Sequence, residues 1–111
     1  MKDDALYLGH MLDTARLALA KAENKSRAAY DADENLRIVL THLIQTIGEA
    51  ARLVSERTRV AHPQIPWRQI VGMRHRIVHD YLHVDYDTVW EVVIHDLPAL
   101  VNVLAAALAG E

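Results

Sequence analysis

Cysteine is absent from this sequence of 111 residues, and glycine and proline are scarce, with four and three residues. Without cysteine the chain has no disulfide framework, no thiolate metal site and no cysteine nucleophile. This usage fits a reducing compartment, so we expect a cytoplasmic protein. The shortage of glycine and proline removes the commonest interruptions of a helix, and long helices are therefore expected.

Signals for a membrane are also missing from the sequence. The chain opens with Met1-Lys2-Asp3-Asp4, so acidic residues precede any apolar run, which is not the pattern of a secretory signal. No stretch approaches roughly 18 apolar residues free of charge, the length that a membrane span needs. The most apolar segment, residues 97–109, is shorter, and we expect a buried helix there and no membrane contact.

The composition and the hydrophobic pattern together predict the fold class. Hydrophobic residues make up 51% of the chain and charged residues 24%, as in globular proteins, and the length suits one domain over residues 1–111. Apolar residues recur at three- and four-residue steps, most clearly over residues 4–22 and 34–60, and no region alternates as a strand does. The pattern predicts an all-α fold, an up-and-down bundle of four or five helices.

Several residues mark where the inner helices begin and end. Asp33 is placed to cap the helix over residues 34–60, and Gly48 inside that helix indicates a close approach by another helix. Two prolines within four residues then stop the helix. The second of them, Pro66, is suited to open a third helix over residues 66–78.

The last part of the chain predicts a final helix and a surface for self-association. Asp85 or Asp87 can cap this helix, and Pro98 would kink it or split it in two. Trp67 and Trp90 are expected in the core or in an interface. Because the C-terminal tail and the second long helix are so apolar, a helical dimer interface is expected.

Charge is distributed unevenly along the chain. The net charge of −3 argues against a general nucleic-acid coat protein. Residues 52–79 nevertheless hold six arginines and one acid, whereas residues 80–96 hold five acids and neither lysine nor arginine. A local basic surface able to meet phosphate is one interpretation, and two solvated helix faces of opposite charge are the other.

Histidine spacing raises the possibility of a metal site. His75, His79 and His83 are spaced by four residues, so on one continuous helix they would share a face. There is no His-Glu-x-x-His motif and no acid placed like a third ligand of known type, although Asp80 and Asp85 stay possible ligands. We expect no metal and no other cofactor.

A second possibility combines Arg74 and His79 for chemistry on phosphate. Ribonuclease catalysis without metal needs a base, an acid and a fixed cation, which histidine and arginine supply. Five residues on an ideal helix turn by about 140°, so the two side chains would not share a helical face. A working pair would need a helix end near His79, the long reach of Arg74, or a second subunit, and an exposed arginine with a satisfied interface histidine is the structural alternative.

The segment Arg74-His75-Arg76-Ile77-Val78-His79-Asp80-Tyr81 resembles the Arg-x4-His-x-Tyr signature of HepT-like toxins in the HEPN superfamily. The resemblance continues in family order over nearly the whole chain. It includes the opening helix at residues 7–12, a central Gly-Glu-Ala segment at 47–51, the run into the motif at 65–73, and the segments 84–90 and 96–98.

The resemblance implies a HEPN-like helical domain that dimerises, with the motif in a cleft between subunits. It implies metal-independent RNA cleavage by a toxin, with Arg74 and His79 as the catalytic pair. The sequence leaves both mRNA and tRNA open as the substrate. The implied partner is an MNT-type nucleotidyltransferase antitoxin, which would add AMP to Tyr81 and form a hetero-oligomer with the toxin. Bulk and negative charge on Tyr81 would then keep an RNA phosphate out of the cleft.

One motif position departs from the family. Many members have asparagine directly after the arginine, whereas this sequence has His75, which can replace the asparagine hydrogen bonds or share the proton transfers. The alternative function is a catalytically weak HEPN protein that acts mainly as the binding partner of the nucleotidyltransferase.

Overall fold

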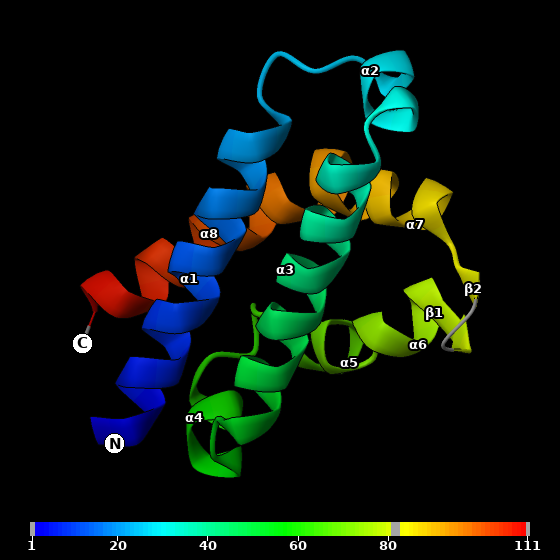
Figure 1. Ribbon diagram of the computed structural model, residues 1–111. Helices are drawn as coiled ribbons and strands as arrows, with labels where there is room; N and C mark the ends of the chain where they lie inside the picture. The colour runs from blue at the N-terminus through cyan, green and yellow to red at the C-terminus, as the bar shows by residue number, and fades with distance from the viewer. Residues whose placement is uncertain (1, 81–82, 111) are drawn as a thin grey trace.

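The computed structural model describes residues 2–80 and 83–110, and the regular structure within them is almost entirely helical. Helices α1 (Lys2–Ala22) and α3 (Glu34–Leu53) lie side by side and antiparallel (Figure 1). The short helix α2 (Arg27–Ala32) joins them at one end. The prediction of an all-α fold is confirmed.

Helix α3 begins as the sequence predicts and makes the expected close contact at its glycine. The Asp33 carboxylate accepts a hydrogen bond from the Leu36 N–H at 3.0 Å, which caps the helix. A methyl group added to Gly48 would lie 3.1 Å from the carbonyl oxygen of Ile70 on helix α5 (Trp67–Val71). Glycine therefore lets the backbone of α5 approach α3 at this point.

The predicted helix over residues 34–60 is interrupted, because α3 ends before Val54 and a separate helix, α4 (Glu56–Ala61), follows. Val54 is extended, with ψ at 135°, and Ser55 caps α4. Ser55 also donates its N–H at 2.9 Å and its hydroxyl at 2.6 Å to the buried carboxylate of Asp4 on α1. The prediction of one long helix is wrong because this distant contact fixes a turn.

The predicted helix over residues 66–78 is two short helices, α5 and α6 (Met73–Ile77), that meet at Gly72. A small antiparallel hairpin follows, formed by β1 (Val78–Asp80) and β2 (His83–Val84). The sequence pattern did not predict this hairpin, because strands of two and three residues are too short to show alternation.

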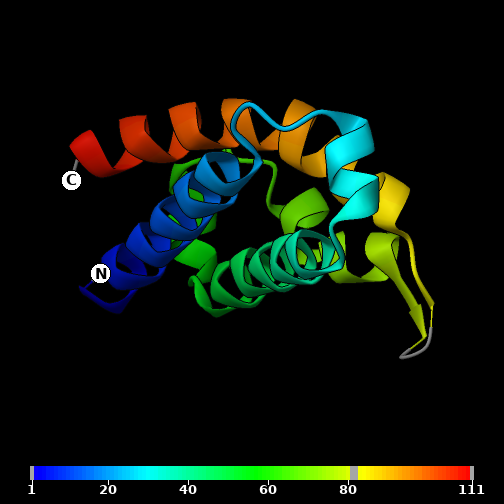
Figure 2. The same cartoon turned by 45° about the horizontal axis from the view of Figure 1, so that its top comes forward.

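The chain ends in one long helix built from α7 (Tyr86–Glu91), η1 (Val92–Asp96) and α8 (Leu97–Ala109). It crosses the α1–α3 pair and brings the C-terminal end to the same side of the molecule as the N-terminal end of α1 (Figure 2). Asp85 caps α7 by accepting a hydrogen bond from the Thr88 N–H at 3.0 Å, as predicted.

Pro98 changes the winding of this helix and does not split it. Proline has no N–H, and its ring crowds the carbonyl four residues earlier. The turn before it is a π-helix, in which the Leu97 N–H bonds to the Val92 carbonyl five residues back.

Within the described residues, 86–109 is the single helix long and apolar enough to cross a membrane by length and composition alone. That is weak support for a span, because core helices of soluble proteins pass the same test.

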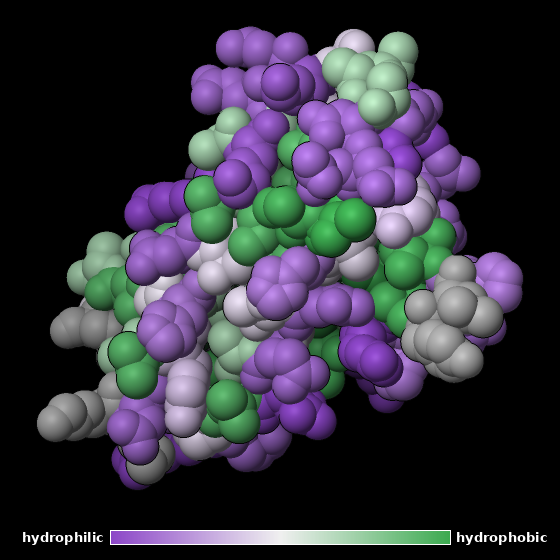
Figure 3. Space-filling view, viewed as in Figure 1, coloured by the Kyte–Doolittle hydropathy of each residue, from purple (hydrophilic) through white to green (hydrophobic). Residues whose placement is uncertain are grey.

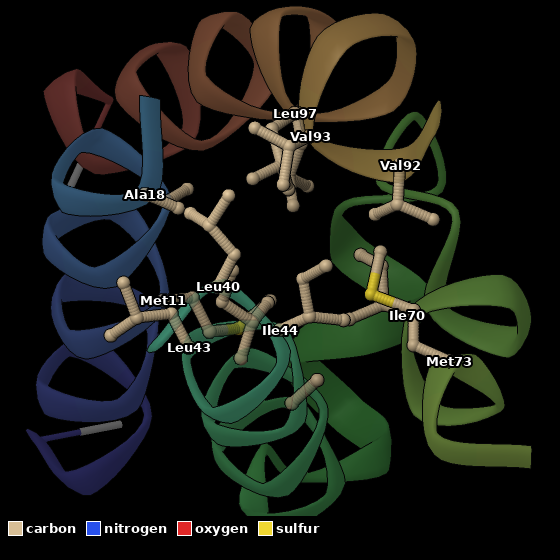
Figure 4. Packing of buried hydrophobic residues seen from close by; sticks show 14 of the residues in the cluster. Met11, Ala18, Leu40, Leu43, Ile44, Ile70, Met73, Val92, Val93 and Leu97 are labelled. Atoms are coloured by element: carbon tan, nitrogen blue, oxygen red, sulfur yellow. The ribbon is translucent and has the colours of Figure 1, made fainter. Parts of the chain in front are cut away.

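Side chains from several helices meet in one core. Figure 4 shows Met11 of α1, Ile44 of α3, Ile70 of α5 and Leu97 of α8 directed toward a common interior, and each is at most 1% exposed. Burying one such side chain contributes about 1.5–3 kcal/mol relative to exposing it. The core therefore anchors α5 and, through Met73, α6, the two helices that carry the motif and the residues before it.

A second part of the core attaches α2 to the final helix. Tyr30 is fully buried, its hydroxyl donates to the Tyr86 carbonyl at 2.7 Å, and its ring centroid lies 4.7 Å from that of Trp90. Burial raises the pKa of Tyr30, so its phenol keeps its proton. Trp90 is a core residue, as expected from the sequence.

Candidate active site

Helix α6 carries the first half of the Arg-x4-His motif. Arg74 and His75 are exposed on it, while Met73 and Ile77 are buried against the core. The helix ends at Ile77 and the chain continues as strand β1, which holds His79. For Arg74 and His79 to act as a pair, their spacing needs a helix end near His79, the long reach of Arg74 or a second subunit. The structure contains the first of these, the helix end.

A basic groove of about 770 Å³ lies between α3 and α4 on one side and α5 and α6 on the other. Its lining includes two carboxylates, Glu49 and Glu56. Hydrophilic side chains dominate the face shown in Figure 3, and apolar ones form separate patches. Each of the four helices contributes one arginine to the groove: Arg52, Arg59, Arg68 and Arg74. Four arginines against two carboxylates make this groove basic, which agrees with the first of the two interpretations of the arginine run.

The basic side chains of the groove differ in what holds them. Arg52 donates to Glu49 at 2.9 Å, and Arg59 donates to three carbonyl oxygens near the end of α3 at 3.0–3.2 Å. Within the described chain, no hydrogen bond or ion pair engages the side chains of the other three: Arg68, Arg74 and His75. These exposed groups are available to a ligand, and the two arginines carry charge at any working pH.

The histidine on the hairpin faces a carboxylate. His79 Nε2 lies 4.0 Å from Asp85 Oδ2, and the His79 side chain is 64% exposed. The backbone N–H and the hydroxyl of Thr88, at 3.0 Å and 2.7 Å, lower the pKa of Asp85, and His79 adds a smaller effect in the same direction. Asp85 therefore presents a fixed negative charge to the imidazole ring.

The structure brings some of the predicted site residues together and leaves others apart. Arg74 and His75 line the same groove, but His79 is not among the residues that line it. Tyr81, the predicted modification site, lies outside the described residues. The groove lining thus holds one member of the Arg74–His79 pair, and completion of the pair by a second subunit stays a prediction.

The helical face considered for a metal site does not form. His75 lies on α6, whereas His79 and His83 lie in β1 and β2. His83 instead pairs with Asp80, with 2.9 Å between Nδ1 and Oδ1. In residues 2–80 and 83–110, no three carboxylate or imidazole side chains are grouped so that they could hold a metal ion.

Trp67 has a place in the site that the sequence did not predict. It is half-buried, its Nε1–H donates to the His62 carbonyl at 3.0 Å, and it lines the groove. The guanidinium of Arg59 lies 5.8 Å from the centroid of the indole ring. The available signal was its position directly before Arg68, one of the groove's arginines, but the sequence analysis assigned it to the core or an interface.

Comparison with known proteins identifies relatives along most of the chain. The model of the family described as ribonuclease HepT-like matches residues 11–107. A protein of Caldanaerobacter subterraneus subsp. tengcongensis, named as a candidate RNase, is 29% identical over 100 residues, which are 90% of this chain and 89% of that protein. A candidate RNase of Methanocaldococcus jannaschii is 25% identical over 99 residues, 89% of this chain and 91% of its own.

A third relative is named "Probable ribonuclease HepT". It comes from Thermococcus cleftensis and is 32% identical over 68 residues, which are 61% of this chain and 62% of that protein. No solved structure gives a significant match.

Proposed function

This chain belongs to the HepT-like ribonuclease family, and we propose that it is a metal-independent endoribonuclease, the toxin of a cytoplasmic toxin–antitoxin pair. The observation that carries the proposal is the arginine-lined groove next to the motif, in which Arg74 and His75 are exposed and not engaged by any described side chain. Exposed guanidinium groups bind phosphate with charge-assisted hydrogen bonds, and RNA is the phosphate ligand of the family.

In the proposed reaction, His79 accepts the proton of a ribose 2′-hydroxyl. The 2′-oxygen forms a bond to phosphorus, the bond from phosphorus to the 5′-oxygen breaks, and the leaving oxygen takes up a proton, for which His75 is a candidate donor. The products are a 2′,3′-cyclic phosphate and a 5′-hydroxyl end. Arg74 stabilises the negative charge that develops on the phosphorus oxygens.

We propose that a second copy of the chain completes this site. In one chain His79 lies on the hairpin and outside the groove that contains Arg74. A two-fold axis beside α6 and the hairpin would bring two arginines and two histidines of the motif into one cleft. The exposure of Arg74, His75 and His79 in a single chain is compatible with such a shared cleft.

The proposed antitoxin is an MNT-type nucleotidyltransferase that modifies Tyr81. The phenolic oxygen would attack the α-phosphorus of ATP, pyrophosphate would leave, and AMP would stay bound to the tyrosine. Tyr81 follows His79 by two residues in the sequence, and the negative charge of the added phosphate would repel RNA. Incubation with the nucleotidyltransferase and ATP should add the mass of AMP to wild type and not to Tyr81→Phe, whereas equal modification of both proteins would refute the assignment.

Cleavage of RNA by the purified protein in EDTA tests the ribonuclease proposal. Wild type should cleave, and Arg74→Ala and His79→Ala should each lower the rate by at least about 100-fold. Arg57→Ala is the matched control, because Arg57 is exposed on α4 and does not line the groove. Intact RNA with wild type would instead favour the catalytically weak HEPN protein that serves to bind the nucleotidyltransferase.

A further inference from the structure

The basic groove extends well beyond the motif, and this extension includes an aromatic ring. Trp67 and Arg68 line the groove from α5, the helix before the one that carries Arg74. We propose that this part of the groove binds the RNA strand next to the scissile phosphate, with Trp67 as a stacking surface for one base and Arg68 as a contact to a neighbouring phosphate. The proposal rests on the ribonuclease function proposed above.

The indole ring of Trp67 is held in place before any ligand arrives. Its Nε1–H donates to the His62 carbonyl at 3.0 Å, and the Arg59 guanidinium lies 5.8 Å from its centroid. The ring is only half-buried, so part of its surface stays open to the groove. A fixed and partly exposed ring loses little entropy on stacking, and base–aromatic stacking is typical of proteins that bind single-stranded nucleic acid.

Arg59 acts on this surface indirectly. Its guanidinium donates to the carbonyl oxygens of Val54 at 3.2 Å, Ala51 at 3.0 Å and Arg52 at 3.1 Å. These bonds engage the Nε and Nη2 groups at the end of α3 and hold the guanidinium in place, so Arg59 acts as a positioning residue for the ring of Trp67.

Arg68 is suited to contact a phosphate. It is exposed, it lines the groove, and no described side chain engages its guanidinium. Gly72 also lines the groove, between Arg68 and Arg74 in the sequence, so the same surface includes both arginines. The two arginines can therefore hold successive parts of one strand, the second of them at the scissile phosphate.

The chemistry of the groove favours a nucleic-acid strand over an acidic peptide. Its carboxylates, Glu49 and Glu56, are outnumbered by arginines, and Glu49 is neutralised by Arg52 at 2.9 Å. A peptide would use the guanidinium groups but has no need of an open indole ring. A volume of about 770 Å³ lies within the range of pockets for small ligands, which fits a short piece of a strand and not a folded partner.

The test measures how tightly a 12-nucleotide single-stranded RNA binds, by fluorescence anisotropy at several salt concentrations. All proteins carry His79→Ala, so that the RNA is not cleaved during the measurement. Arg68→Ala should weaken binding about tenfold and lower the slope of log K against log salt by about 0.7, the value for one phosphate contact on a single strand. Trp67→Leu should weaken binding at least about fivefold and leave the salt slope unchanged. Arg16→Ala, which removes an exposed arginine of α1 that is no part of the groove, is the matched control.

A second readout does not depend on the folding of Trp67→Leu. In the protein that keeps Trp67, RNA stacked on this ring should quench the tryptophan fluorescence. Trp90 is 8% exposed and should contribute little to the change. Equal effects of Arg68→Ala and Arg16→Ala, absence of quenching, or equally tight binding of poly-glutamate would overturn the proposal. If wild type cleaves RNA and these results are negative, the groove assignment alone fails; if wild type neither binds nor cleaves RNA, the proposed function fails.

Discussion

The Asp4 carboxylate connects α1 to the turn before α4, and its removal should destabilise the protein in a pH-dependent way. Asp4 is 4% exposed and accepts hydrogen bonds from the Ser55 N–H at 2.9 Å, the Ser55 hydroxyl at 2.6 Å and the Thr58 hydroxyl at 2.6 Å. The Ser55 hydroxyl has the largest effect in lowering the pKa of Asp4 from 3.8 to about 2. Since α4 lines the basic groove, this carboxylate also fixes one side of the candidate site.

The size and sign of the effect follow from the lowered pKa of Asp4. A fall from 3.8 to about 2 corresponds to about 2.5 kcal/mol of unfolding free energy, at roughly 1.4 kcal/mol for each tenfold change in proton affinity. Because the pKa is lower in the folded state than in the unfolded state, this stabilisation is complete above about pH 5. It is lost as the pH falls through about 4 toward 2.

Urea unfolding followed by circular dichroism at pH 7, 5 and 3 measures this contribution. Asp4→Asn should lose about 2 kcal/mol at pH 7, and its difference from wild type should shrink between pH 5 and pH 3. Asp3→Asn is the matched control, because Asp3 is the exposed neighbour on the same helix, and it should stay within about 0.5 kcal/mol of wild type. A stability of Asp4→Asn equal to that of wild type at pH 7, or a difference independent of pH, would refute the reasoning.

Three further substitutions test local features of the fold. Tyr30→Phe removes the donor that lies 2.7 Å from the Tyr86 carbonyl and should cost about 1–2 kcal/mol in urea unfolding; an unchanged midpoint would contradict this. Gly48→Val places a side chain against the Ile70 carbonyl, where a Cβ atom would lie at 3.1 Å, and should lower the melting temperature; a rise would show that α5 moves aside freely. Asp85→Ala should cost about 1 kcal/mol through the lost cap of α7, and Asp85→Asn much less, so equal losses would count against capping as the cause.

The sequence predicted the parts of the fold that depend on local signals. Asp33 and Asp85 cap the helices they were expected to cap, and Gly48 lies at a close helix contact. The break at Ser55 was not predictable in this way, because it depends on Asp4, 51 residues away, and hydrophobic periodicity carries no information about such a partner. The small hairpin after α6 was missed for a different reason. Its strands of three and two residues are too short to show alternation, and no glycine or proline marks the end of the helix before it.

The candidate site was predictable in its residue types and less so in its geometry. A basic surface was one of two interpretations of the arginine run. The sequence did not show that the Arg59 guanidinium donates to carbonyl oxygens at the end of α3, whereas Arg68 and Arg74 stay available to a ligand. Helical spacing alone separated Arg74 from His79, and the helix end at Ile77 changes the direction of the chain between them. The place of Trp67 in the groove required three-dimensional contacts that spacing does not supply.

The central claim is that Arg74 and His79 act together in a cleft shared by two copies of the chain. The most direct measurement is the RNA cleavage rate of a heterodimer of Arg74→Ala and His79→Ala, co-expressed with different tags and purified through both. Such a heterodimer keeps one intact arginine and one intact histidine, on different chains. We predict that it regains a substantial part of the wild-type rate while each homodimeric variant stays inactive, and a heterodimer as inactive as either variant alone would contradict the shared site.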